Sequence, residues 1–314
     1  MSKVTVFFVL IISINLFKSI IFEPDSLPKN SEVIVKPGMS LNEITDLLST
    51  EKIINNPFFF KLWIKLNFLE KKIKFGEFFF NGNDSIYDIS KKLVEGDFTF
   101  RQLTIVEGTY KYNLLEKLKK IDPNSNLKYE DIPNNIIADT YNYQATDTAD
   151  RILKEIKKIS DEFANKTWSM RDQSIPLRNL DEVFILASVV EMETSLSHEK
   201  PIISGVFFNR LNKKMRLQSD PTVLFSITKG KSKLERQLTR KDLKYKSPYN
   251  TYRIKGLPPS IICFPGRDSV VSVTQPLKSD LLYFVAKNYN GEHYFSSSYK
   301  EHLRNVEAAR NEKK

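Results

Sequence analysis

The first 22 residues are almost entirely apolar. The stretch MSKVTVFFVLIISINLFKSIIF has no charge between Val4 and Phe17, and only Lys18 interrupts the run after that. About twenty such residues cross a bilayer as a helix, and Lys3 ahead of them is typical of an N-terminus that stays in the cytoplasm. We therefore expect residues 1–22 to be an uncleaved single-pass anchor, with the rest of the chain outside the cytoplasmic membrane. A cleaved signal peptide and a buried core helix are the alternatives, but no A-x-A-like cleavage site follows the run.

Short apolar patterns of two kinds follow a polar linker at residues 23–31. The strand-like EVIVKPG leads into SLNEITDLL, which begins with a capping box of Ser40 and Glu43 and carries apolar residues at helical spacing. The stretch DSIYDISKKLVEG repeats this arrangement, and the apolar helix NPFFFKLWIKLNF lies between the two copies. A strand, a turn and a capped helix used twice predict a small α+β module over residues 32–105.

Longer helices and irregular segments alternate over residues 106–314. TADRILKEIKKISDEFANK has one apolar face, NLDEVFILASVVEMETS is apolar almost throughout, and QSDPTVLFSITKG begins with an Asp-Pro pair suited to a helix start. LLYFVAKNYNGEHYFSS alternates around Asn290-Gly291, which is a strong hairpin signal. KSPYNTYRIKGLPPSIICFPG holds four of the fourteen prolines and cannot be regular. We expect a mixed α+β domain here, and an α+β chain overall behind its transmembrane helix.

Composition excludes several classes of function. The net charge is +10, but the lysines are spread along the whole chain, without an arginine-rich stripe or a zinc-finger spacing, so we do not expect a nucleic-acid partner. The single cysteine, Cys263, rules out an intramolecular disulfide. The three histidines lack metal-ligand spacing, and no phosphate-binding or dinucleotide loop is present. We therefore expect no metal and no cofactor.

Two glutamates stand at the end of the apolar helix, in the stretch ASVVEMETS. Burial of a carboxyl group raises its pKa, and a general acid that works near neutral pH needs such a raised value. Helical spacing places Glu191 on a face with Phe184 and Ala187, and it places Glu193 on another apolar face. The pattern alone does not choose between the two glutamates. A frayed last turn that exposes both to solvent is the alternative.

Four blocks of the sequence resemble the YceG-like family, the endolytic murein transglycosylases called MltG. These blocks are ASVVEMETS, FFNRLNKKMRLQSDPTV, SPYNTYRIKGLPPSIICFPG and YFVAKNYNGEHYFSSSYKEH. Their order and spacing are similar to those of the family, and the resemblance covers nearly the whole chain. The module at residues 32–105 resembles the family's LysM-like subdomain, and residues 106–314 resemble its catalytic domain.

The resemblance implies roles for particular residues. It implies that Glu191 is the catalytic glutamate and that Glu193 supports it by binding substrate. It also implies further substrate contacts in the Q-S-D-P and Y-N-T-Y blocks, namely Gln218, Asp220, Tyr249, Asn250 and Tyr252. Ser260 stands where the family usually has glycine, and Ala138 stands where it has proline.

The resemblance also implies a reaction. One glutamate would protonate the bond between N-acetylmuramic acid and N-acetylglucosamine within nascent glycan strands and would then act as a base. The C6 hydroxyl of the sugar would attack internally, with a high effective molarity, and leave a 1,6-anhydro end. Peptidoglycan strands are the expected substrate, and peptidoglycan synthases are expected partners. A non-catalytic anchor protein that only binds peptidoglycan is the alternative.

Overall fold

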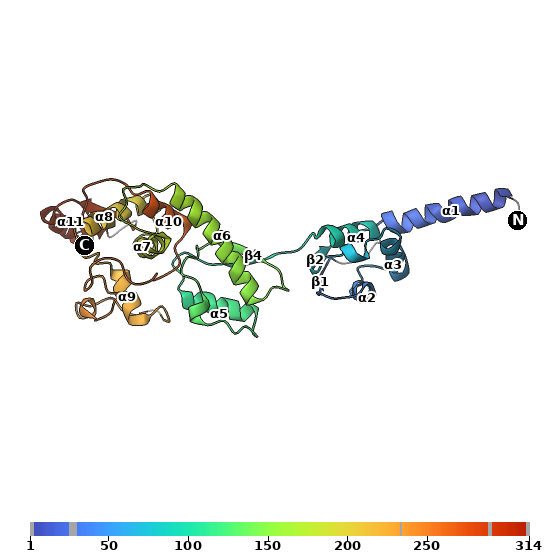
Figure 1. Ribbon diagram of the computed structural model, residues 1–314, viewed down its shortest axis with the longest axis horizontal. Helices are drawn as coiled ribbons and strands as arrows, with labels where there is room; N and C mark the ends of the chain where they lie inside the picture. The colour runs from blue at the N-terminus through green and yellow to red at the C-terminus, as the bar shows by residue number, and fades with distance from the viewer. Residues whose placement is uncertain (1–2, 25–29, 233, 288–290, 312–314) are drawn as a thin grey trace. The chain divides into compact units, whose positions relative to one another are not determined.

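The computed structural model describes residues 3–24, 30–232, 234–287 and 291–311. It is a mixed α+β structure with an apolar helix at the N-terminus, as expected (Figure 1). The chain forms two compact units, of which the first holds the residues up to Gln102 together with 142–147, and the second holds the rest. The functional division expected at residue 105 stays a prediction.

Helix α1 (Lys3–Phe22) begins the first unit. Its segment Thr5–Phe22 has a mean hydropathy of 2.2 and is long enough to cross a membrane, which fits an anchor or a signal sequence. The side chains described in its first four turns are exposed, but the last turn packs into the unit, where Ile21 is 0% exposed.

The rest of the first unit consists of a two-stranded sheet and three helices. Strand β1 (Ser31–Val35) pairs antiparallel with β2 (Gly76–Phe80), from Ser31 opposite Phe80 to Val35 opposite Gly76. The helices are α2 (Leu41–Thr50), α3 (Pro57–Leu66) and α4 (Ile86–Glu95), and a short 3-10 turn, η1 (Glu70–Lys72), follows α3. Both capping boxes are confirmed, because Ser40 with Glu43 and Ser85 with Asp88 exchange the expected bonds. The apolar faces of the sheet and helices share one core with Ile21.

A second pair of strands lies where the chain passes between the units. Strands β3 (Arg101–Thr104) and β4 (Thr140–Tyr143) form a two-stranded sheet, and the division between the units runs through both strands. Between them come α5 (Lys111–Ile121) and the 3-10 turn η2 (Tyr129–Asp131).

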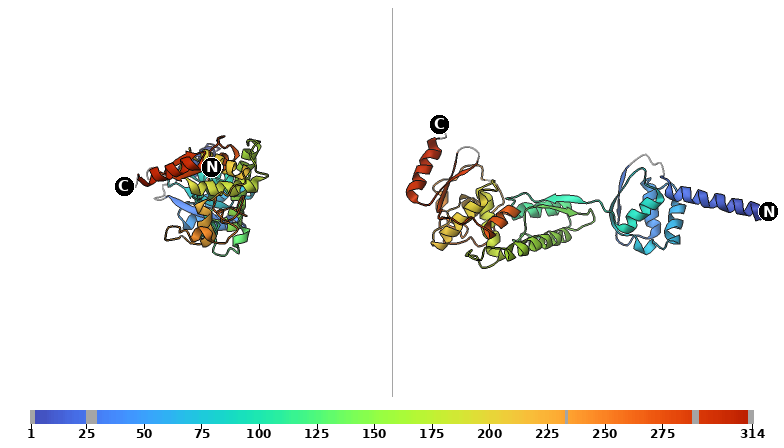
Figure 2. Two further views of the ribbon diagram at one scale, coloured as in Figure 1. Left: turned by 90° about the vertical axis from the view of Figure 1, so that its left-hand side faces the viewer. Right: turned by 90° about the horizontal axis from the view of Figure 1, so that it is seen from above.

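The second unit is built around a central helix, α7 (Leu180–Glu193). It contacts α6 (Ala149–Ser169), α8 (Lys200–Asn212), α9 (Asp220–Thr228) and α10 (Arg267–Thr274), as the two views in Figure 2 allow the reader to follow. Because helices cover it on several sides, the apolar residues of α7 from Val183 to Val190 are almost all fully buried. The nearly uniform apolar sequence of this segment follows from its central position.

A hairpin and a last helix complete the second unit. Strand β5 (Tyr283–Ala286) pairs antiparallel with β6 (His293–Ser296), and α11 (Tyr299–Asn311) packs on both. The expected turn at Asn290-Gly291 lies partly outside the described residues. Among the described residues between α9 and α10, a short 3-10 turn, η3 (Asp242–Lys244), is the one helical element, and the proline-rich stretch from Lys246 to Gly266 holds no helix or strand, as expected.

Candidate active site

Glu191, in the last turn of α7, is enclosed by hydrogen-bond donors. The Nζ atom of Lys200 lies 3.1 Å from its Oε1 and 3.2 Å from its Oε2. The backbone N–H of Gly266 donates to Oε2 at 2.9 Å, and the Ser269 hydroxyl donates to the same oxygen at 2.6 Å. The side chain is 5% exposed, so these donors fill both oxygens in a buried place.

The ion pair of Glu191 joins three helices. Lys200 begins α8 and is 1% exposed, while Gly266 is the residue that caps the N-terminus of α10. A carboxylate beside the free N–H groups of a helix N-terminus is favourable. Removing either partner of a buried ion pair is strongly destabilising, because the other charge stays behind unpaired. Glu191 therefore holds α7, α8 and α10 together.

A second glutamate, Glu107, lies close to both Lys200 and Glu191. The Oε2 atom of Glu107 is 3.8 Å from Nζ of Lys200, and its side chain is half exposed. The pKa of Glu107 is raised, first by partial burial and then by the negative charge of Glu191. This side of α7 is thus a network of charges, whereas the sequence predicted apolar cover from Phe184 and Ala187 on one side of the Glu191 carboxyl and named no charged partner for it.

Glu193 has the opposite surroundings. Its Oε1 atom is buried, and no hydrogen-bond partner for it lies among the described residues. Burial raises the pKa of Glu193 to about 7, and the negative charge of Asp220 acts in the same direction. The Ser219 hydroxyl and the Arg210 guanidinium act against this shift. The residue as a whole is only partly buried, although Oε1 of the carboxyl group is shielded from solvent.

The Q-S-D-P and Y-N-T-Y blocks meet beside Glu193. The phenol of Tyr252 donates to Oδ1 of Asp220 at 2.6 Å. Burial and the bond to Asp220 raise the pKa of Tyr252, and the charge of Glu193 contributes to the same shift. Thr251 joins the two blocks, since its Oγ1 accepts from the N–H of Ser219 at 2.9 Å and lies 2.8 Å from Oγ1 of Thr222. The structure therefore brings Glu193, Asp220 and Tyr252 together.

Gln218, two residues before Asp220, has an uncommon backbone conformation. Its φ angle is +51°, in the left-handed region that few residues other than glycine adopt. Its N–H donates to the carbonyl of Thr251 at 3.2 Å, and the preceding carbonyl, of Leu217, accepts from Arg210 at 2.5 Å. The side chain of Gln218 is exposed next to Asp220. Strain of this kind persists only where the surroundings enforce it.

Tyr249 and Asn250 have different places. The half-buried ring of Tyr249 packs on Phe225, with 4.9 Å between ring centres, and Nζ of Lys229 lies 5.3 Å from the centre of the Tyr249 ring. Asn250 is 0% exposed, and its Nδ2 donates to the carbonyls of Leu243 and Tyr245. Its Oδ1 accepts from the N–H of Tyr252 at 2.9 Å. Asn250 therefore shapes the loop, and its buried amide has no atom facing a substrate.

The two departures from the family pattern lie in loops of the second unit. The N–H of Ala138 donates to the carbonyl of Pro265 at 2.8 Å, a bond that proline could not make. Pro265 precedes Gly266, so this bond supports the loop that binds Glu191. The hydroxyl of Ser260 donates to Oδ1 of Asn134 at 3.3 Å.

Several residues in this region were not singled out from the sequence. Lys200 lies outside the four blocks, and Arg210 and Ser219 lie inside them without a role assigned to them. The packing of α8 on α7 brings Lys200, at the start of α8, to Glu191, and the segment after α8 brings Ser219 to Glu193. No spacing or motif marked these contacts.

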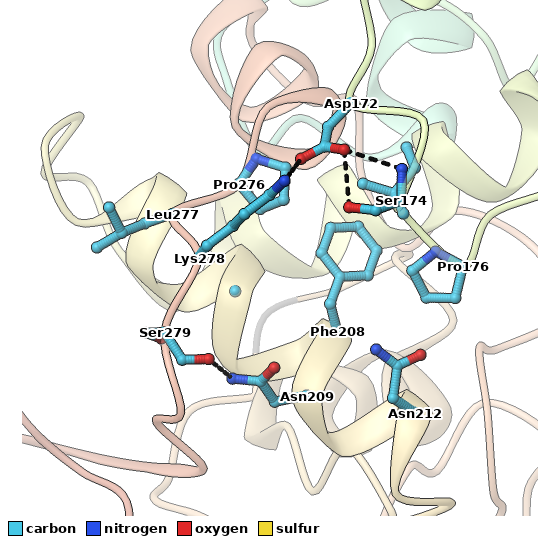
Figure 3. Close-up of a pocket in the computed structure, with 12 residues that line it drawn as sticks. Asp172, Ser174, Pro176, Phe208, Asn209, Asn212, Pro276, Leu277, Lys278 and Ser279 are labelled. Atoms are coloured by element: carbon cyan, nitrogen blue, oxygen red, sulfur yellow. Dashed lines mark hydrogen bonds and ion pairs between the residues drawn. The ribbon is translucent and has the colours of Figure 1, made fainter.

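A surface pocket elsewhere in the second unit is not part of this group. Figure 3 shows it between α8 and the segment around Leu277, with Asp172 bonded to Ser174 and, at 2.7 Å, to Lys278. A Cβ atom on Gly205 would lie 2.3 Å from the carbonyl oxygen of Leu277, so only glycine allows this close approach. None of the candidate residues described above lines the pocket. Among the described residues, no group of three or more His, Cys, Asp or Glu side chains could hold a metal ion.

The chain matches a protein-family model over most of its length. The model describes the YceG-like family and matches residues 33–308, which include every candidate residue named above. The chain belongs to the YceG-like family. A crystal structure of a yceG-like protein from Listeria monocytogenes is similar to it, at 28% identity and a TM-score of 0.51, over 88% of this chain and 99% of that one.

Two relatives bear the name endolytic murein transglycosylase. The protein from Bacillus subtilis (strain 168) is 28% identical over 316 residues, which is 89% of this chain and 85% of that protein. The protein from Streptococcus pneumoniae (strain R6) is 32% identical over 206 residues, which is 64% of this chain but only 36% of that protein. The family and the name of these homologues agree with the resemblance in the four sequence blocks.

Proposed function

We propose that the chain is a membrane-anchored murein lytic transglycosylase with Glu193 as its general acid. The observation that carries the proposal is the state of this carboxyl group. Its Oε1 is buried without a partner among the described residues, and its pKa is raised to about 7, beside Asp220 and Tyr252. A general acid works best with a pKa near the operating pH. The names of the homologues supply the substrate, murein.

This proposal moves the acid from Glu191, where the resemblance placed it, to Glu193. A general acid must hold a proton and present it to the substrate. Both oxygens of Glu191 already accept hydrogen bonds, from an ammonium, an amide and a hydroxyl, whereas Oε1 of Glu193 has no partner among the described residues. We assign Glu191 to positioning: its ion pair with Lys200 fixes the last turn of α7, two residues before Glu193.

The reaction follows from a single acid. Glu193 donates its proton to the glycosidic oxygen, and the bond to the N-acetylmuramic acid carbon breaks. The C6 hydroxyl of the same sugar attacks that carbon, and the Glu193 carboxylate takes the hydroxyl proton. Because the nucleophile belongs to the substrate, its effective molarity is high and no second carboxylate is needed to position water.

The neighbouring residues suit the binding of a glycan. Asp220 and Tyr252 form a hydrogen-bonded pair beside the acid, and a carboxylate oxygen of Asp220 can accept from a sugar hydroxyl. The exposed amide of Gln218 can both donate and accept. The Tyr249 ring, supported by Phe225, offers a face for the C–H groups of a sugar ring. The amide of Asn250 is committed to its own loop, so we leave it out of this set.

Helix α1 and its contact with the first unit support the proposal that the chain is anchored in the membrane. Helix α1 is long and apolar enough to anchor the chain in the cytoplasmic membrane, where nascent strands are made. The packing of Ile21 in the core of the first unit favours a retained anchor over a cleaved signal, since cleavage after Phe22 would remove that side chain. We propose that the first unit assists glycan binding without cutting, and that peptidoglycan synthases are partners.

The products of digestion test the reaction type. We expect purified glycan strands treated with the full chain in detergent to yield fragments that end in 1,6-anhydro-N-acetylmuramic acid, because the attacking hydroxyl is internal. Mass spectrometry separates these ends from reducing ends by the mass of one water. Reducing ends as the main product would instead indicate hydrolysis, with Asp220 as the carboxylate that positions water. No cutting at all by the folded chain would favour a protein that only binds peptidoglycan.

The pH dependence tests the link between Asp220 and Glu193. The charge of Asp220 raises the pKa of Glu193, so Asp220→Asn should lower that pKa. A general acid is active while protonated, and activity therefore falls as the pH rises through its pKa. We expect the alkaline limb of kcat/KM to move to lower pH in Asp220→Asn. Glu307→Gln, on an exposed part of α11, removes the same charge and should leave the limb in place. An unmoved limb in Asp220→Asn would show that another group controls it.

A further inference from the structure

Helix α3 packs against the C-terminal end of α1. The rings of Phe17 and Phe59 are 6.2 Å apart between centres, and those of Phe22 and Trp63 are 5.5 Å apart. Figure 1 and the right-hand view of Figure 2 both draw α3 at the α1 side of the first unit, with its axis across that of α1. The first turn of α3 therefore reaches back alongside the apolar segment.

The contact with Phe17 sets the depth of α3. The apolar segment ends at Phe22, five residues after Phe17, and a helix rises 1.5 Å per residue, so Phe17 lies about 7.5 Å inside the end of the segment. The whole segment is about 27 Å long, close to the roughly 30 Å of the hydrocarbon core, so its end at Phe22 lies near the boundary between hydrocarbon and headgroups. With α1 across the membrane, residues that touch Phe17 lie at that boundary or just inside it.

The surface of α3 and the following turn is apolar and basic. Phe58 is 71% exposed, Leu66 is 58% exposed and Phe68 is 84% exposed. These three exposed apolar side chains belong to one helix and the turn that follows it, and such side chains are candidates for an interaction surface. Lys61 and Lys65 are the charged residues of the stretch from 57 to 69, which contains no acidic residue. Aromatic residues with lysines beside them are typical of helices that lie in the membrane–water interface.

We propose that α3 lies in the outer interface of the cytoplasmic membrane and forms a second lipid contact beside α1. Phe58 and Phe59 reach the edge of the hydrocarbon, and the two lysines face anionic headgroups. The inference rests on α1 spanning the membrane and is independent of the reaction proposed above. It accounts for the exposure of the α3 side chains, because lipid covers them.

Tryptophan quenching by brominated lipids tests the contact. The chain has two tryptophans, Trp63 and Trp168, so Trp168→Phe leaves Trp63 alone. Two further full-length chains add Trp63→Phe and carry a new tryptophan by Phe58→Trp or by Phe100→Trp. Phe100 is the matched control, because it is also an exposed phenylalanine of the first unit, with 52% of its surface exposed. Tyr87, in the first turn of α4, contacts Phe22 of α1, whereas Phe100 follows the other end of α4. Each chain is placed in phosphatidylglycerol and phosphatidylcholine vesicles whose acyl chains carry bromine near the headgroup.

We expect most of the emission to be lost in the Phe58→Trp chain and in the chain with Trp63 alone, and little to be lost in the Phe100→Trp chain. An Ile12→Trp chain, made in the same background, tests the premise in a second set of vesicles whose acyl chains carry bromine near the bilayer centre, where its emission should be quenched best. If the Ile12→Trp chain is quenched and the Phe58→Trp and Phe100→Trp chains behave alike, the proposal is wrong. If the exposed side chains of α3 instead bind a partner protein, the Phe58→Trp and Phe100→Trp chains should be quenched alike, because the vesicles contain no such partner.

Discussion

The substitution Glu193→Gln is expected to slow murein cutting roughly 10²–10⁴-fold, the usual contribution of a positioned general acid. Glutamine keeps the shape of the side chain and has no proton to transfer, and no second carboxyl group in the proposed reaction replaces it. The rate of release of soluble fragments from purified glycan, measured with the full chain in detergent, checks the prediction. Cutting at a normal rate by this variant would disprove the assignment.

Glu191→Gln is the matched comparison, since it makes the same change two residues away on the same helix. Its amide loses the ion pair with Lys200 but can still accept from Gly266 and Ser269. We expect it to lower stability more than it lowers the activity of the folded fraction. If Glu191→Gln abolished cutting without loss of stability, and Glu193→Gln did not, the roles of the two glutamates would be reversed.

Stability should separate the two variants as well. The pKa of Glu193 is raised to about 7 from an ordinary value of 4.5, so the folded chain binds more protons than the unfolded chain between these values. Stability from this group is therefore lost as the pH rises from about 4.5 to about 7. Glutamine has no charge to bury, and Glu193→Gln should unfold at higher denaturant than the parent chain at pH 8. The difference should shrink at pH 5.

The substitution Lys200→Met is expected to lower the free energy of unfolding of the second unit by about 3–5 kcal/mol, because it leaves Glu191 as a buried charge without its counterion. Lys200 is 1% exposed and the Glu191 side chain is 5% exposed, so water cannot replace the ammonium. Urea titration of the full chain in detergent measures the effect. Trp168, in the second unit, reports it in a Trp63→Phe background.

A double variant separates charge from packing. Buried ion pairs replaced as a pair by apolar residues of similar size are often as stable as the original. Lys200→Met combined with Glu191→Gln removes both charges, and the amide oxygen can still accept from Gly266 and Ser269, so this double variant should recover much of the lost stability. A double variant that is as unstable as the two single losses added together would show that the shapes of Glu191 and Lys200, and not their charges, hold the three helices.

Local signals in the sequence predicted local structure well. The two capping boxes begin helices at the residues expected, since a serine and an acidic residue three positions later satisfy the same backbone groups in any surroundings. The glutamate pair was also singled out, because two carboxylates at the end of an apolar helix are costly to place without a purpose, and its role stays a prediction.

The choice between the two glutamates could not be made in the same way. Helix α7 is covered on several sides, so its sequence has no polar face to show which direction leads to solvent. The partner that distinguishes them, Lys200, belongs to the next helix, and only the packing of α8 on α7 brings it to Glu191. The burial of Asn250 was not predicted for a similar reason. Its side chain makes three hydrogen bonds to the backbone of its own loop, and backbone groups leave no signal in the sequence.

The burial of Ile21 has consequences for the height of the first unit above the bilayer and for the design of truncated, soluble forms of the chain. A flexible tether would let the first unit sample many heights above the bilayer. If α1 is the membrane anchor proposed above, its last turn is part of a folded core, and the helix would act as a rigid stalk that fixes this height. Truncation after Phe22, the usual way to make such a chain soluble, would also leave a cavity where the isoleucine packs. Loss of a large buried aliphatic side chain typically costs about 2–5 kcal/mol. A weak glycan interaction measured on such a fragment would then report a damaged module as well as a missing membrane.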